Sequence, residues 1–119
     1  MNDNKRYRIY SVNLSDINSE KDDQNFFNKI IEKKFDWWRY FPLNWVIITP
    51  YEVSTNDIIL LLSECYNNTF FSVFEINIKD IGGVMPGNKA TLDKSIKIES
   101  PLEFFYKIKA PDFKFNWEK

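Results

Sequence analysis

The spacing of apolar residues changes several times along the chain and predicts alternating strands and helices. Residues 6–14 have the two-residue period of a strand, with Tyr10, Val12 and Leu14 on one face. Apolar residues then recur at the spacing that lines one side of a helix, and these are Phe26, Phe27, Ile30 and Ile31. We expect Asp22 or Asp23 to cap this helix at its amino end.

Two extended runs follow, at 37–41 and 44–49. Only Pro42 and Leu43 separate them, a length typical of a turn between antiparallel neighbours. The two runs therefore predict a pair of adjacent strands.

The second helix has the clearest start in the chain. Ser54 and Asp57 have the spacing of a capping box, and Val53 and Ile58 stand where a hydrophobic staple is expected. We expect Asn67 or Asn68 to end the helix with a left-handed residue.

A two-residue period returns in the second half of the chain. Residues 70–79 place Phe74, Ile76 and Ile78 on one side and polar residues on the other. The same period recurs at 102–109 and at Phe113, Phe115 and Trp117, which predicts further strand material towards the carboxyl end.

The resulting order is strand, helix, strand, strand, helix, strand. It predicts an α+β, ferredoxin-like βαββαβ fold, an antiparallel sheet with two helices on one face and extra C-terminal strand material. We expect one domain over residues 1–119, with 111–119 forming an edge strand or a strand exchanged in a dimer. Because the helices cover only one face, aromatic residues on the other face predict a homodimer.

Length, charge and composition exclude several classes of function. The 119 residues suffice for one core, and 16 basic against 17 acidic residues predict no strong attraction to polyanions. The chain has no His and one Cys, which excludes a His-based triad, a His-ligated zinc site and an internal disulfide. Cys65 falls in the apolar second helix and is expected to be a buried structural thiol.

No apolar run is long enough for a bilayer span, and the amino end lacks the apolar region of a signal peptide, so we expect a cytoplasmic protein without a membrane partner.

Several motifs, in their order along the chain, resemble the SinR-type relatives of the small CRISPR adaptation endoribonuclease-like family. The motifs are Tyr10-Ser11-Val12-Asn13-Leu14, Trp37-Trp38-Arg39-Tyr40-Phe41, Asn44-Trp45-Val46-Ile47 and Gly83-Val84-Met85-Pro86. The resemblance covers about residues 6 to 87. It implies the ferredoxin-like fold, a dimer, and Asn13, Trp37, Trp38, Arg39, Tyr40, Trp45 and Pro86 as the residues of a family motif or interaction site.

The departures from the family pattern bear on catalysis. Asn13 stands where the resemblance implies a metal-binding Asp, and Arg39 stands where it implies a His. An amide oxygen is a poorer ligand than a carboxylate for a hard cation. We therefore expect a non-catalytic homodimeric interaction protein without a cofactor. The alternative is a metal-dependent endoribonuclease using Mg²⁺ or Mn²⁺, in which Asp16 would replace the missing ligand.

Nucleic-acid binding is the remaining alternative. Aromatic residues make up 18% of the chain, and Arg6, Arg8 and Arg39 are available for phosphates. A nucleic-acid module normally carries a clear basic excess, whereas the formal net charge here is −1. Nucleic acid is therefore not the favoured partner.

Overall fold

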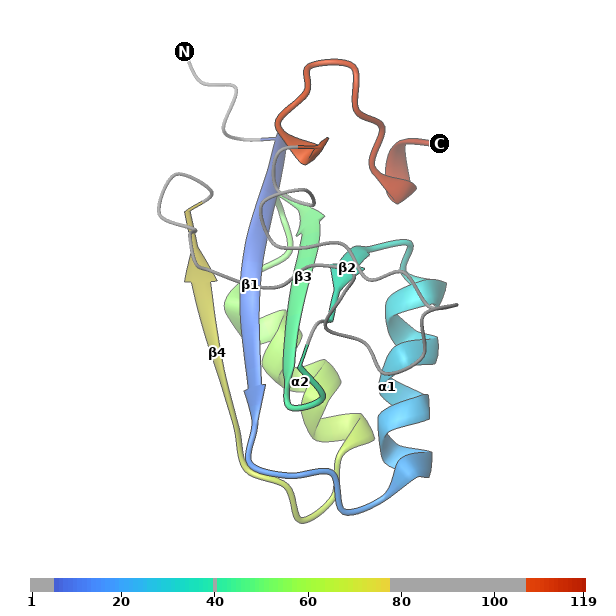
Figure 1. Ribbon diagram of the computed structural model, residues 1–119, viewed down its shortest axis with the longest axis vertical. Coiled ribbons are helices and arrows are strands. Elements are labelled where there is room, and N and C mark those ends of the chain that lie inside the picture. Colours follow the sequence, from blue (N-terminus) through green and yellow to red (C-terminus); the bar gives the residue numbers. More distant parts are fainter. Residues whose placement is uncertain (1–5, 40, 78–106) are drawn as a thin grey trace.

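The computed structural model describes residues 6–39, 41–77 and 107–119. Its main elements follow in the order β1 (Tyr7–Leu14), α1 (Glu20–Glu32), β2 (Asp36–Trp38), β3 (Asn44–Pro50), α2 (Thr55–Cys65) and β4 (Phe71–Ile76). The strands form one antiparallel sheet in the order β2-β3-β1-β4 (Figure 1). The chain thus has the α+β, ferredoxin-like arrangement that the pattern predicts.

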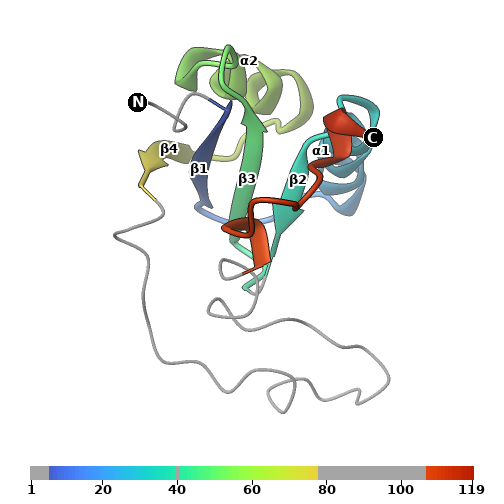
Figure 2. The ribbon, with the colours of Figure 1, turned by 90° about the horizontal axis from the view of Figure 1, so that it is seen from above.

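The two faces of the sheet are covered by different parts of the chain. Helices α1 and α2 lie on one face, called the helical face below, and residues 107–119 lie on the other, called the tail face (Figure 2). On the helical face, Tyr10, Val12 and Leu14 are buried in one core with Phe26 and Ile30 of α1. These three residues share one face of β1, as the two-residue period predicts.

The cap of α1 differs from the expectation. Ser19, not Asp22 or Asp23, is the N-cap, and its Oγ accepts a hydrogen bond from the backbone N–H of Asp22 at 3.2 Å. The two Asp side chains make tertiary contacts instead: Asp22 accepts from the backbone N–H of Asn67, and Asp23 binds Arg39. Both lie in the first turn, where the helix dipole also favours negative charge.

The start of α2 confirms the prediction. Ser54 and Asp57 form the capping box, and Ile58 is fully buried with Val53 packed against the same core. Asn68 has a φ of 60°, the left-handed conformation expected after this helix. No helix within residues 6–39, 41–77 or 107–119 is long and apolar enough to cross a bilayer.

The carboxyl-terminal segment differs from the strand expected at 111–119. Residues 107–119 consist of a short helical turn, bends and a 3₁₀-helix at Asn116–Glu118. The backbone N–H of Glu118 bonds to the carbonyl of Phe115 at 2.9 Å, which closes the 3₁₀ turn and prevents an extended course. The expectation of an edge strand in the chain's own sheet is thus corrected. An exchanged strand in a dimer remains a prediction, and residues 102–106 of the predicted late strand lie outside the described residues.

Candidate functional site

The described residues of the predicted interaction motif lie on both faces of the sheet. Trp37, Arg39 and Trp45 lie on the helical face of the sheet, whereas Asn13 and Trp38 lie on the tail face. Tyr40 and Pro86 lie outside the described residues. Adjacent residues of an extended strand point to opposite faces, so the period of β2 separates Trp37 from Trp38.

Arg39 fastens the β2–β3 turn to α1. Its guanidinium binds the carboxylate of Asp23 through two hydrogen bonds, of 2.8 and 3.0 Å, and donates from Nε to the carbonyl of Pro42 at 3.0 Å. It also stacks on the ring of Trp45, with 4.3 Å between Cζ and the ring centroid. The charge of Arg39 is thus paired with Asp23, its N–H groups donate to Asp23 and Pro42, and the plane of its guanidinium packs on Trp45.

Asp23 connects this contact to the end of α2. The hydroxyl of Tyr66, the residue after that helix, donates to the Asp23 carboxylate. Burial opposes ionisation of Asp23, but the hydrogen bonds from Arg39 and Tyr66 outweigh it and hold the pKa of Asp23 below its usual value. Burial, together with the hydrogen bond to Asp23, raises the pKa of Tyr66. Tyr66 therefore stays a neutral donor and Asp23 a charged acceptor over the physiological pH range.

Aromatic rings complete the packing around this polar contact. Trp45 is 1% exposed, and its ring lies 5.4 Å from that of Phe26 and 5.6 Å from that of Trp37. Phe27 of α1 contacts Trp37 edge to face at 5.2 Å. The contact among Arg39, Asp23 and Tyr66 therefore joins the end of β2 to α1 and to the end of α2, next to a packed aromatic core. The role of this contact is structural.

Asn13 occupies the position where the family resemblance implies a metal ligand. Its Oδ1 accepts a hydrogen bond from Asn44 Nδ2 at 2.8 Å, and the same amide nitrogen lies 3.2 Å from the Oγ of Ser11. Asn13 and Asn44 are direct partners across β1 and β3. The side-chain oxygen of Asn13 is thus engaged in a cross-strand amide contact.

Asp16, the predicted alternative metal ligand, and the acidic residues of the nearby strands have separate partners. Asp16 is exposed and accepts from the Ser15 hydroxyl at 3.0 Å. Glu75 pairs with Arg8 at 2.9 Å, while Asp36 is half-buried and accepts from the backbone N–H of Asn116. Over 6–39, 41–77 and 107–119, no three His, Cys, Asp or Glu residues are grouped so that they could hold a metal ion.

Cys65, the single thiol of the chain, is buried in the core under α2. Burial raises the pKa of this thiol, which keeps it in the protonated and unreactive form. The expectation of a buried thiol is confirmed.

The other two arginines considered for phosphate contacts also have partners within the chain. Arg6 binds both carboxylate oxygens of Glu118, at 2.7 and 3.1 Å. Arg8 donates to the carbonyl of Tyr51 at 2.6 Å and stacks on the Tyr51 ring at 4.1 Å. Binding a phosphate would require each guanidinium to leave these contacts.

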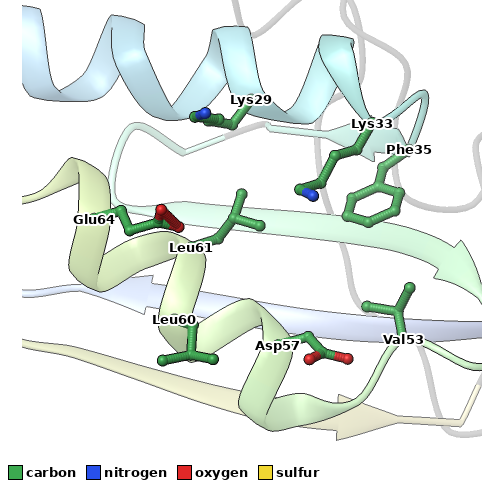
Figure 3. Close-up of a pocket in the computed structure, with 8 residues that line it drawn as sticks. All are labelled: Lys29, Lys33, Phe35, Val53, Asp57, Leu60, Leu61 and Glu64. Atoms are coloured by element: carbon green, nitrogen blue, oxygen red, sulfur yellow. The ribbon is translucent and has the colours of Figure 1, made fainter.

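A shallow groove of about 400 Å³ runs between the two helices (Figure 3). Phe35 and Leu61 are its buried apolar residues. Lys29 and Lys33 of α1 line one side, and α2 contributes acidic residues to the other. The groove thus carries opposite charges on its two sides.

The tail face is covered only in part. Phe115 is fully buried and packs with Ile9, Ile48 and Trp38, which belong to β1, β3 and β2. Figure 2 shows residues 107–119 over β3 and β2 and away from β4. On β4 and the residue before it, Phe74 is 59% and Phe70 is 84% exposed. Large apolar side chains are therefore left open at one edge of the sheet.

Comparisons with protein-family models, with curated proteins and with solved structures found no match for the chain. The SinR-type resemblance thus stays a prediction that rests on the motifs of the sequence.

Two features of the site were not identified from the sequence. The contact of Asp23 with Arg39 and Tyr66 joins residues 16 and 43 positions apart, and no local pattern marks such a pairing. The exposure of Phe74 was also missed, because a two-residue period shows which residues share a face but does not show whether that face is covered. The sequence did indicate that Phe74 and Ile76 lie on the same side, as they do.

Proposed function

We propose that this chain is a cytoplasmic, non-catalytic interaction protein that acts as a homodimer, and that the dimer forms at the β4 side of the sheet. One observation carries the proposal: β4 combines an outer edge free of any described strand with two exposed phenylalanine rings. Such an edge is a template for pairing with another chain, and exposed apolar surface beside it favours association.

The sequence of β4 supports this choice of surface. Its six residues, Phe-Ser-Val-Phe-Glu-Ile, contain no proline or lysine, the residues that commonly protect an exposed edge. Glu75 is its single charged residue, and its carboxylate is paired with Arg8 of the neighbouring strand. The outer edge of β4 therefore carries little that would repel a second strand.

The polar groups considered for catalysis support an interaction role over chemistry. Asn13 is engaged by Asn44, and Arg39 is engaged by Asp23, Pro42 and Trp45. The raised pKa of Cys65 disfavours the thiolate that a nucleophile needs.

The test is the molar mass of the full chain in solution, measured by light scattering over a range of concentrations. We expect a dimer for the unaltered protein and a monomer for Phe74→Glu, because a carboxylate in the centre of the interface would lose its hydration. Leu60→Glu is the matched control, since Leu60 is 56% exposed and lies on α2, on the opposite side of the sheet. We expect this variant to remain dimeric.

Two results would contradict the proposal. The first is an unaltered protein that stays monomeric at every concentration. The second is a dimer that Phe74→Glu leaves intact or that Leu60→Glu abolishes. Cleavage of RNA by the pure protein with Mg²⁺ or Mn²⁺ would contradict the non-catalytic part.

A further inference from the structure

The register of the sheet determines which backbone groups of β4 have no partner in the described strands. Ser72, Phe74 and Ile76 stand opposite Asn13, Ser11 and Ile9 of β1. The carbonyl of Phe70, at the start of this series, accepts from the backbone N–H of Ser15 at 2.8 Å.

In an antiparallel pair, alternate residues direct both backbone groups to the same neighbour. Residues 70, 72, 74 and 76 therefore bond towards β1. The intervening residues Phe71, Val73 and Glu75 direct their N–H and C=O groups away from it, to the outer edge. This edge offers three donors and three acceptors.

From these groups we infer that β4 pairs in antiparallel fashion with β4 of a second copy, with Val73 directly opposite the partner's Val73. The inference rests on the proposed homodimer and specifies its register. A two-fold axis at Val73 sets Phe71 opposite the partner's Glu75, so all three outward residues pair. If the register is shifted by two residues in either direction, only two of the three outward residues of each strand find an outward residue of the partner opposite them.

The same register brings the exposed rings together. Phe70 comes to lie opposite the partner's Ile76, and Phe74 opposite the partner's Ser72, all on the tail face. Each Phe74 is then a diagonal neighbour of the partner's Phe70. Four rings that are largely exposed in the single chain thus form one apolar cluster across the axis.

The other face of the new pair also suits this register. Phe71 and Val73 pack against the helical core and present their apolar sides at the edge. Glu75 lies beside the partner's Phe71, and its contact with Arg8 means that its charge has a partner within the same chain. No two like charges are placed opposite each other.

Cysteine cross-linking of the full chain tests the register. In the inferred pair the two Val73 Cα atoms are about 5.5 Å apart, within the range of a disulfide, whereas the two Ser72 Cα atoms are diagonal neighbours at about 8 Å, beyond it. We expect Val73→Cys to form a covalent dimer under mild oxidation. Ser72→Cys, the control on the same strand, should form several-fold less, although Ser72 is the more exposed of the two positions. The unaltered chain, with its buried Cys65, serves as the blank.

The outcomes separate this inference from the proposed function. If the protein is dimeric but Ser72→Cys cross-links as well as Val73→Cys or better, the register is wrong and the dimer stands. If the protein is monomeric, the proposed function is wrong, and the register inferred from it is wrong as well. Should Val73→Cys not fold, an equimolar mixture of Phe71→Cys and Glu75→Cys chains reports the same register. Absence of a covalent dimer in that mixture would then overturn the inference.

Discussion

The two edge strands of the sheet differ in how the rest of the chain contacts them. At β2, Asn116 of the tail donates from its backbone N–H to Asp36 at 2.8 Å and from its side chain to the carbonyl of Phe35 at 3.2 Å. At β4, the described chain contributes a neighbour on the inner side only. Figure 1 shows β4 at one margin of the molecule and residues 107–119 towards the other.

The difference is that Asn116 of the tail binds the β2 edge, whereas no described strand pairs with the outer side of β4. On the β2 side, the Arg39 contact and the tail fix strands, helices and carboxyl terminus to one another. On the β4 side, Phe70 and Phe74 are exposed, and the described chain offers no strand to the outer edge. Natural proteins normally protect edges against unwanted pairing, so the unprotected edge of β4 supports the proposal that a second copy binds there.

The largest expected effect is on the closed side. Phe115→Ala removes a ring that is 0% exposed and stacked on Trp117 at 4.7 Å, so we expect a loss of about 3 to 5 kcal/mol in the free energy of unfolding. Phe74→Ala, the control on the open side, should change the stability of the monomer by less than about 1 kcal/mol. Urea unfolding of dilute samples measures both. Equal losses for the two variants would remove the contrast between the edges.

An intermediate effect is expected where Arg39 fastens the β2 side. Asp23→Asn should cost about 1 to 3 kcal/mol at neutral pH, because charge-assisted hydrogen bonds with Arg39 and Tyr66 are weakened. The pKa of Asp23 in the folded state is lowered from an ordinary value of 3.8, so its stabilisation is full above that value and is lost as the pH falls through the lower folded value.

Thermal unfolding at several pH values checks this expectation. The difference between the unaltered protein and Asp23→Asn should shrink below about pH 4. Asp22→Asn, a neighbouring change at a more peripheral contact, serves as the control and should cost less. A difference that is the same at pH 3 and pH 7 would contradict the assigned role of the carboxylate.

The smallest effect is expected at the rim of the tail. Arg6 and Glu118 form an ion pair whose side chains are 34% and 27% exposed, so solvent screening limits its contribution. Glu118→Gln should therefore cost less than about 1 kcal/mol, and the cost should decrease in high salt. Thermal melts at low and high ionic strength measure it. A larger, salt-independent loss would mean that the tail is fixed mainly by this pair and not by Phe115.

Most of the fold could be predicted from the sequence, because its signals are local. The strand period placed Tyr10, Val12 and Leu14 on one face, which is the face buried under the helices, and the capping box located the start of α2. The cap of α1 was mistaken because Asp22 and Asp23 resemble caps, although Ser19 stands three residues before Asp22, the same spacing as Ser54 and Asp57.

The tail and the site depend on contacts between distant parts of the chain. The period of Phe113, Phe115 and Trp117 is compatible with a strand and also with rings stacked around a 3₁₀ turn. The burial of Phe115 against β1, β2 and β3 favours the 3₁₀ turn over the strand. The exposure of Phe74 likewise depends on which part of the sheet the tail covers, and the two-residue period of β4 does not show it.

Amide hydrogen exchange of the unaltered protein, followed residue by residue in β4, tests the central claim most directly. Phe74 and Ile76 donate to β1, so their amides should be protected at every concentration. The amides of Phe71, Val73 and Glu75 should exchange quickly in dilute samples and slow markedly as the concentration rises and the outer edge becomes paired. Fast exchange at these three positions at all concentrations, in a sample that is dimeric by mass, would show that the open edge of β4 is not the surface that the two copies share.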